Sequence, residues 1–255
     1  MSFTYNNKVV GEGIPLIFQH GLAANLNQII GLLDGIKNVK LAVMDCPGHG
    51  LSRLEDVTPS FDNYTDLVVR FLDHLGIERA VVGGLSMGSG IALNLCLRYP
   101  DRVTALILHR PAWLDSIDPK NLMILKEAIP YMRSQDGLSE FQQTKSYVNI
   151  ESRLQLAAKS IAGVFSEEQQ ADLPTVLDKM VGDKPFDNVE SLRSINVPCL
   201  ILANDDDPLH PYSMREIIHD NISNSVLKKV TSRYIDGEMH IREVKNYILD
   251  FIQKL

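Results

Sequence analysis

Short, unbroken apolar runs alternate with longer amphipathic segments along most of this 255-residue chain. Runs such as Leu41–Met44 and Cys199–Ala203 lack the polar alternation of a half-solvated strand, so they suit strands buried on both faces of a parallel sheet. Six strands are predicted: Ile14–His20, Lys40–Asp45, Arg79–Ser86, Val103–Arg110, Pro198–Asp205 and Lys229–Asp236. Strands that alternate with helices predict a doubly wound, mostly parallel α/β sheet, whose site lies at the carboxyl ends of the strands.

Helix signals fill the segments between these strands. Ser60 can cap a helix over Phe61–Leu75. A second helix is expected to begin at Met87 and to end before Pro100, because the residue before a proline disfavours the α region. The last expected helix is Ile241–Leu255.

The alternation is interrupted once, over residues 113–196. This segment has no convincing strand but has amphipathic stretches, among them Pro119–Ile129 and Ser152–Val164. We interpret it as a helical cap inserted into an α/β core made of residues 1–112 and 197–255.

Composition excludes several classes of function. The formal net charge is −7 and the basic residues are scattered, which argues against a nucleic-acid-binding role. We find no signal-peptide pattern and no apolar run long enough to span a bilayer, so no membrane partner is expected. The three cysteines, Cys46, Cys96 and Cys199, lack disulfide or metal-ligand spacing, which fits a reducing, cytoplasmic setting. Nothing in the sequence indicates an oligomeric state.

The segment Gly84-Leu85-Ser86-Met87-Gly88 follows a predicted strand and opens a predicted helix. A G-x-S-x-G sequence in this context is typical of a nucleophile elbow, in which a sharp turn exposes the serine hydroxyl. Ser86 is therefore the candidate nucleophile. The alternative is a glycine-rich turn before a helix that binds phosphate.

A serine nucleophile needs a base, and the base needs an orienting acid. Among the later histidines, His219 falls on a helix surface, and His210 stands in the same loop as the candidate acids. We favour His240, because it follows the last predicted strand and precedes the last helix. The acid is expected just beyond the strand that ends near Asn204, where three consecutive carboxylates compete: Asp205, Asp206 and Asp207.

Four ordered motifs resemble those of the α/β-hydrolase superfamily, along nearly the whole chain. They are Phe18-Gln19-His20-Gly21-Leu22, Asp45-Cys46-Pro47-Gly48-His49-Gly50-Leu51-Ser52, Ser86-Met87-Gly88, and Asn204-Asp205-Asp206-Asp207-Pro208-Leu209-His210-Pro211. In the family's acid loop the acid stands four residues before the second proline, which selects Asp207. His240 matches the family's base, with Met239 where the family usually has glycine.

The resemblance implies an α/β-hydrolase fold and an esterase-like serine hydrolase without metal or organic cofactor. Ser86, Asp207 and His240 would form the triad, and the N–H groups of Leu22 and Met87 the oxyanion hole. The substrate would be a small acyl compound: an ester, lactone or thioester. A C–C bond hydrolase, a lyase or an enol-lactonase with the same triad, and a ligand receptor with little turnover, are the alternatives.

Two further side chains, Arg110 and Trp113, have two interpretations each. Arg110 ends its predicted strand at the active-site edge, where it could clamp a substrate carboxylate or, as we favour, form a salt bridge to the cap. Trp113 could line an acyl pocket or belong to the core of the cap. His20 and His49 are expected to shape their turns rather than to take part in the chemistry.

Overall fold

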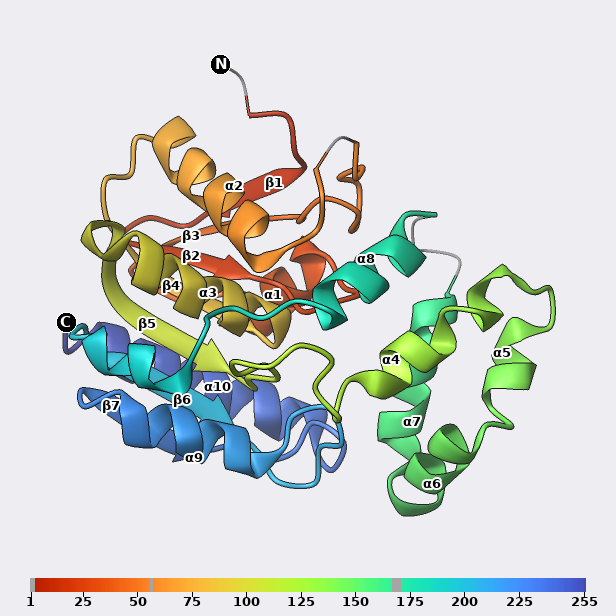
Figure 1. The fold of residues 1–255 in the computed structure, drawn as a ribbon. Coiled ribbons are helices and arrows are strands. Elements are labelled where there is room, and N and C mark those ends of the chain that lie inside the picture. Colours follow the sequence, from red (N-terminus) through yellow and green to blue (C-terminus); the bar gives the residue numbers. More distant parts are fainter. Residues whose placement is uncertain (1–2, 56, 167–170) are drawn as a thin grey trace.

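The computed structural model describes residues 3–55, 57–166 and 171–255. Its centre is a seven-stranded sheet of order β1-β3-β2-β4-β5-β6-β7, in which β1 pairs antiparallel and the other pairings are parallel (Figure 1). The strands are β1 (Asn7–Val10), β2 (Ile14–Gln19), β3 (Val39–Met44), β4 (Ala80–Leu85), β5 (Val103–His109), β6 (Cys199–Ala203) and β7 (Ser225–Lys229). This architecture confirms the predicted doubly wound, mostly parallel α/β fold.

Helices cover both faces of the sheet. One face carries α2 (Phe61–His74), α3 (Met87–Arg98) and α9 (Tyr212–Asn221); the other carries α1 (Leu26–Leu33) and α10 (Gly237–Ile252). The apolar run of β5 is unbroken because its alternate residues pack into the cores on opposite faces of the sheet. Leu106 and Leu108 join the α2–α3 core, whereas Ala105 and Ile107 join the α1–α10 core.

Five of the six predicted strands match β2 to β6, but the prediction of a strand over Lys229–Asp236 is wrong. Strand β7 ends at Lys229, where the expected strand begins. As an edge strand it is largely exposed, with Val226, Lys228 and Lys229 facing solvent, so it lacks the apolar run that marks the inner strands. The residues that follow β7 form a loop instead.

The helix predictions outside the insertion are largely confirmed. Ser60 caps α2 by accepting a hydrogen bond from the Asn63 N–H at 3.1 Å. Helix α10 begins four residues earlier than expected, because the Asp236 side chain caps it, accepting from the Met239 N–H at 2.9 Å. His240 therefore lies inside the first turn of α10 rather than before the helix.

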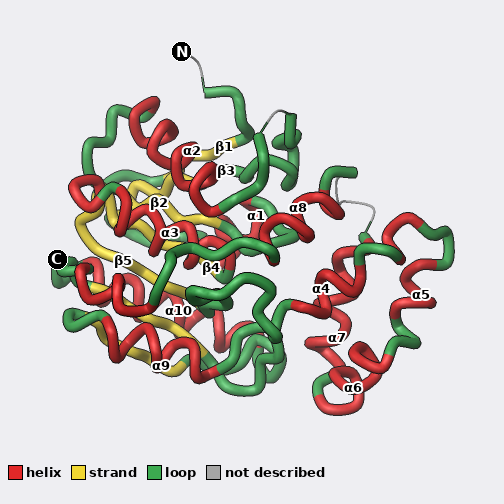
Figure 2. The backbone as a smooth tube through the Cα atoms, viewed as in Figure 1, coloured by secondary structure: helices red, strands yellow, loops and turns green. Residues whose placement is uncertain are grey.

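The described part of residues 113–196 contains helices and no strand. The helices are α4 (Met123–Ala128), α5 (Gly137–Phe141), α6 (Lys145–Arg153), α7 (Gln155–Ala162) and α8 (Leu173–Val181). Short 3₁₀ helices occupy Pro100–Arg102, Tyr131–Arg133, Gly163–Phe165 and Val189–Ser194. Helices α4 to α7 lie to one side of the sheet, beyond the ends of its strands, while α8 lies closer to the sheet (Figures 1 and 2).

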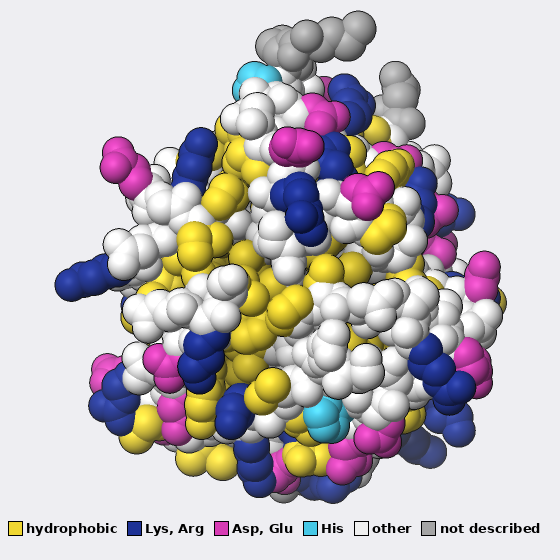
Figure 3. Space-filling model, turned by 90° about the vertical axis from the view of Figure 1, so that its left-hand side faces the viewer, with side chains coloured by type: hydrophobic (Ala, Val, Ile, Leu, Met, Phe, Trp, Pro, Cys, Tyr) yellow, Lys and Arg dark blue, Asp and Glu magenta, His cyan; other side chains and the backbone are white. Residues whose placement is uncertain are grey.

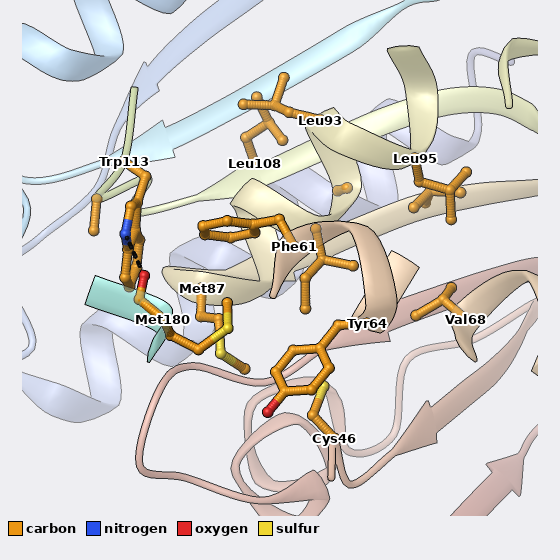
Figure 4. Close-up of a cluster of buried hydrophobic side chains, with 14 of the residues drawn as sticks. Cys46, Phe61, Tyr64, Val68, Met87, Leu93, Leu95, Leu108, Trp113 and Met180 are labelled. Carbon is orange, nitrogen blue, oxygen red and sulfur yellow. Dashed lines mark hydrogen bonds between the residues drawn. The ribbon is translucent and has the colours of Figure 1, made fainter. Parts of the chain in front are cut away.

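Trp113 joins this helical segment to the core. Its indole N–H donates a hydrogen bond to the Met180 carbonyl in α8 at 3.2 Å (Figure 4). Its ring packs edge-on against Phe61 of α2, with the ring centroids 5.5 Å apart. The side chain is buried in a packed core, and it also lines the cavity that contains Ser86, so both sequence interpretations of Trp113 agree with the structure.

The surface carries charges of both signs. On the side turned away from α4–α7, hydrophobic side chains reach the surface between Lys, Arg, Asp and Glu residues (Figure 3). None of the described helices is both long enough and apolar enough to cross a membrane.

Candidate active site

Ser86 occupies the sharp turn between β4 and α3. Its backbone has φ 56° and ψ −109°, a conformation that non-glycine residues rarely adopt. The Ser86 N–H donates to the His109 carbonyl of β5 at 2.9 Å, which ties the turn to the neighbouring strand. The predicted elbow geometry is therefore present.

The glycines beside Ser86 are required by space. A Cβ on Gly84 would overlap the backbone of Gly88, and a Cβ on Gly88 would overlap the Gln19 carbonyl. Neither obstacle is the end of a flexible side chain, so only a backbone shift could relieve the overlap.

We expect Gly88→Ala to lower the free energy of unfolding by about 3 kcal/mol or more, at the upper end for overpacked positions. Gly31→Ala is the matched control, because a Cβ at Gly31, inside α1, meets nothing within 4 Å. The control should gain up to about 1 kcal/mol from helix propensity. Urea denaturation measures both, and equal midpoints for the two variants would contradict the packing argument.

The imidazole that reaches Ser86 is that of His210. Its Nε2 lies 2.9 Å from the Ser86 Oγ, and its Nδ1 lies 2.8 Å from Oδ1 of Asp207. In the neutral tautomer with a proton on Nδ1, His210 donates to Asp207 and accepts the hydroxyl proton of Ser86. All three side chains are buried, so a continuous hydrogen-bonded chain runs from Asp207 to Ser86.

Asp207 is held in its ionised form. Burial by itself would raise the pKa of this carboxyl, but the charges and hydrogen bonds of His210 and Arg110 bring that pKa well below its usual range. Arg110 donates through Nε at 2.9 Å and forms an ion pair through Nη2, both with Oδ2. The Leu209 N–H donates to Oδ1 at 3.2 Å.

The other two aspartates of the acid loop have different surroundings. Asp205 forms ion pairs with Arg215, at 2.6 Å, and with Lys229. Asp206 has a left-handed backbone, with φ 54°. Of the three consecutive carboxylates, Asp207 alone hydrogen-bonds a histidine in the described structure.

The structure does not bring His240 to Ser86, which corrects the expected pairing. His240 Nδ1 donates to the Thr231 carbonyl at 2.7 Å, and its ring centroid lies 5.1 Å from that of His109. The physical reason is the position of β7 and α10: the strand ends early and the helix starts early, so His240 is fixed in a helix on the sheet face. Burial lowers the pKa of His240, which favours the neutral ring there.

His210 could have been found from local spacing. The His210 N–H donates to the Asp207 carbonyl at 3.3 Å, so residues 207–210 form one tight turn. Such a turn can direct the side chains of its first and last residues to the same side. In the sequence, this proximity counts against His210, because the base is expected on a separate segment.

No ion pair joins Arg110 to a described carboxylate of residues 113–196, so the expected salt bridge to the cap is not present in the described structure. Arg110 follows β5 with φ 52° and pairs with Asp207 instead. Its Nη2 also lies 3.1 Å from His210 Nδ1. Burial lowers the pKa of His210; Asp207 raises it and Arg110 lowers it further, with a net decrease.

The loop after β2 is fixed by His20. The Cys46 N–H donates to His20 Nε2 at 3.0 Å, so the proton lies on Nδ1, which donates to the Gly21 carbonyl at 2.8 Å. The Gly21 N–H in turn donates to Gln28 Oε1 at 2.8 Å. Leu22, the next residue, lines the same cavity as Ser86.

Met87 is the first residue of α3, and its N–H therefore has no carbonyl acceptor within the helix. That N–H and the Leu22 N–H remain the predicted oxyanion donors.

The turn after β3 is held in place by the Asp45 carboxylate. The Asp45 carboxylate accepts hydrogen bonds from the Leu26 N–H at 2.7 Å and the Leu51 N–H at 2.9 Å. Burial, with the neighbouring His20, lowers the pKa of His49 to about 3, so His49 is neutral. Its Nδ1 contacts the Pro47 carbonyl at 3.3 Å, as expected for a turn-shaping residue.

A cavity of about 280 Å³ opens on Ser86 and His210. Its apolar wall combines core loops with α4 and α7, and its members are Leu22, Ala23, Ala24, Leu85, Trp113, Leu122, Leu125, Ile161, Val164 and Leu209. Its polar side chains, besides Ser86 and His210, are Gln28, Arg110, Ser160, Arg233 and Tyr234. No Asp or Glu is among the described lining residues.

A family comparison agrees with this geometry. The model of the alpha/beta hydrolase fold family matches residues 14–234, most of the chain. The protein belongs to the α/β-hydrolase fold family.

Similar sequences have varied functions. The chain is 31% identical over 108 residues to a putative non-heme haloperoxidase of Mycobacterium phage D29, a match that covers 42% of this chain and 39% of that protein. It is 23% identical over 252 residues to the poly(3-hydroxyalkanoate) depolymerase of Ectopseudomonas oleovorans, covering 94% and 84% of the two chains. The chain spans less than two fifths of the first relative's length.

Solved structures share the fold at low sequence identity. The enol-lactonase from Burkholderia xenovorans LB400 has a TM-score of 0.76 with 18% identity, covering 97% of this chain and 96% of that one. A thermophilic esterase from Thermogutta terrifontis has a TM-score of 0.75 with 20% identity, covering 97% and 92%. At these identities the likeness concerns the fold.

Proposed function

We propose that this protein is a serine hydrolase that cleaves a small carboxylic ester, lactone or thioester through an acyl-enzyme on Ser86. The observation that carries the proposal is the hydrogen-bonded chain from Ser86 Oγ through His210 to Asp207, at 2.9 and 2.8 Å. A serine hydroxyl bonded to a neutral imidazole, with an ionised carboxylate behind it, is an activated nucleophile.

In the first half of the reaction, Ser86 Oγ attacks the carbonyl carbon while His210 Nε2 takes its proton. Asp207 holds the imidazole in the tautomer that can accept, and its charge stabilises the imidazolium that forms. The proposed oxyanion donors are the N–H groups of Leu22 and Met87, and a single such donor is typically worth about 3 kcal/mol in the transition state. His210 then gives its proton to the leaving alcohol or thiol.

In the second half, His210 takes a proton from water as that water attacks the acyl carbon, and returns the proton to Ser86 Oγ. The helical segment 113–196 would act as a cap over this reaction. Leu125, Ile161 and Val164 of that segment line the cavity, and in this role they exclude bulk water and limit the size of the acyl group.

Labelling with a fluorophosphonate probe, followed by an ester, lactone and thioester panel, tests the proposal. We expect the probe to modify Ser86 and the panel to show turnover, with a burst of the first product when deacylation is slow. 2-Hydroxymuconate semialdehyde is the substrate that tests the alternative, because the 2-hydroxymuconate semialdehyde hydrolase of a Pseudomonas strain is 37% identical over 103 residues, 38% of this chain and 36% of that protein. Cleavage of this compound with all esters untouched would favour C–C hydrolysis, and labelling without any turnover would favour a receptor.

The pH profile should carry the signature of His210. Only the neutral imidazole can accept the Ser86 proton, so kcat/KM should rise with pH through the pKa of His210 and then level off. Because burial and Arg110 lower that pKa, the rise should be centred below the ordinary value for histidine. A kcat/KM that falls with increasing pH across the same range, or stays flat, would contradict His210 as the base.

A further inference from the structure

Arg233 is a cationic side chain at the candidate active site that the proposed chemistry does not use. It lies in the loop between β7 and α10, and it lines the same cavity as Ser86 and His210. It also lines a larger neighbouring cavity of about 800 Å³, and Gln28, Leu85 and Arg110 are shared by both. Arg233 therefore stands at the border of the two cavities.

The charge of Arg233 is not balanced within the described structure. Its Nη2 donates to the Ser160 Oγ of α7 at 3.1 Å, and its guanidinium carbon lies 5.2 Å from the centre of the Tyr234 ring. No ion pair joins it to a described carboxylate, whereas the other arginine of the cavity, Arg110, is paired with Asp207. A guanidinium has five N–H donors, so most of those of Arg233 are available to a ligand.

No described carboxylate near Arg233 forms an ion pair with it. Asp207 pairs with Arg110 and His210, and Asp236 caps α10. Glu238 and Asp236 line the larger cavity together with Arg233, and not the one that contains Ser86. Arg233 is exposed and lines the same cavity as Ser86, so its cation is accessible to a ligand that reaches the nucleophile.

The cavity also limits the ligand. At about 280 Å³ it holds a short acyl group, and Ser86 and Arg233 line it together. A net charge of −7 repels anions at long range, so binding of an anion here depends on the local arginine. Arginine is suited to a carboxylate, which it can bind through two parallel hydrogen bonds.

We infer that Arg233 binds a carboxylate on the acyl part of the substrate. The substrate class is then a monoester, or the corresponding thioester or lactone, of a short dicarboxylic acid. This inference rests on the proposed function, because it takes the carbonyl next to Ser86 as the reacting group. Arg233 sets specificity and takes no proton in the reaction.

Binding to a Ser86→Ala variant tests the inference without turnover. Titration calorimetry compares monomethyl adipate, which carries one carboxylate, with dimethyl adipate, which carries none. We expect the monoester to bind roughly 10- to 100-fold more tightly, the range for a hydrogen-bonded ion pair. The preference should disappear in Ser86→Ala/Arg233→Gln and persist in part in Ser86→Ala/Arg233→Lys.

Two controls separate the cation from its structural contacts. Ser160→Ala, added to Ser86→Ala, removes the hydrogen bond of Arg233 to α7 but keeps the charge, so the preference should remain. Arg242→Gln makes the same change of charge at an exposed position of α10, and it should also leave the preference intact. Equal affinities for the two esters, including no measurable binding of either, or a preference that survives Arg233→Gln, would overturn the inference.

A turnover arm distinguishes this inference from the proposed function. Mono-4-nitrophenyl adipate and its methyl ester are compared in the enzyme with Ser86 intact, after subtraction of the uncatalysed rate. If Ser86 is needed for both esters but both are cleaved equally well, the proposed function stands and the role of Arg233 fails. If the anion binds preferentially but neither ester is cleaved, the proposed function fails and the anion site stands.

Discussion

Ser86→Ala is expected to reduce kcat for ester hydrolysis by roughly 10³- to 10⁶-fold, because the attacking atom is lost while the binding cavity remains. The measurement is hydrolysis of short p-nitrophenyl esters, with proteins of equal purity. The variant should also lose labelling by a fluorophosphonate. Alanine keeps the strained backbone of the elbow, with its φ of 56°, so the comparison isolates the hydroxyl.

Ser213→Ala is the matched control for this experiment. Ser213 is an exposed serine of α9, far along the chain from the elbow, and its variant should label and turn over like the wild type. A Ser86→Ala protein that hydrolyses the esters as fast as the wild type would remove Ser86 from the nucleophile role, and the proposed function with it.

The second large effect is expected at His210. His210→Ala should lower kcat by roughly the same factor as Ser86→Ala, because without the imidazole the hydroxyl is a weak nucleophile. Since the two residues act as a unit, the double variant should be hardly slower than either single variant. Measured kcat/KM for the three proteins, on one ester, checks both statements.

His240→Ala is the informative comparison, because His240 is the base expected from the sequence. In the structure His240 bonds to Thr231 and packs on His109, so its loss should cost stability of about 1–3 kcal/mol and change kcat by less than about tenfold. His219→Ala, on α9, serves as a histidine control with little expected effect. If His240→Ala is as slow as Ser86→Ala while His210→Ala remains active, the base is His240.

Much of the site was predictable from local patterns. The elbow at Ser86 and the turn at Asp45 depend on glycines and on hydrogen bonds between residues close in the chain, so each corresponds to a short motif that can be recognised in the sequence. Asp207 could be placed only through the resemblance, because three adjacent carboxylates look alike without their partners. The partner that distinguishes it, Arg110, stands 97 positions earlier in the chain.

The prediction that His240 is the base is wrong for a reason that lies outside the site. Strand β7 is exposed at the sheet edge, so its residues do not form the apolar run by which the inner strands were found. The apolar residues of the following loop resemble a strand, which places the expected strand end close to His240. The position of α10 then depends on the cap by Asp236, a single hydrogen bond whose effect on His240 no periodicity reveals.

The turn 207–210 carries both the carboxylate and the imidazole, whereas Arg233 belongs to the loop after β7. In the proposed function, proton transfer and substrate choice are thus located on separate stretches of backbone. Lengthening or rewriting residues 230–236 would change which acyl groups are accepted while the distance between acid and base stays fixed by four consecutive residues. A chain built this way can acquire a new substrate through one loop, without having to rebuild its reactive centre.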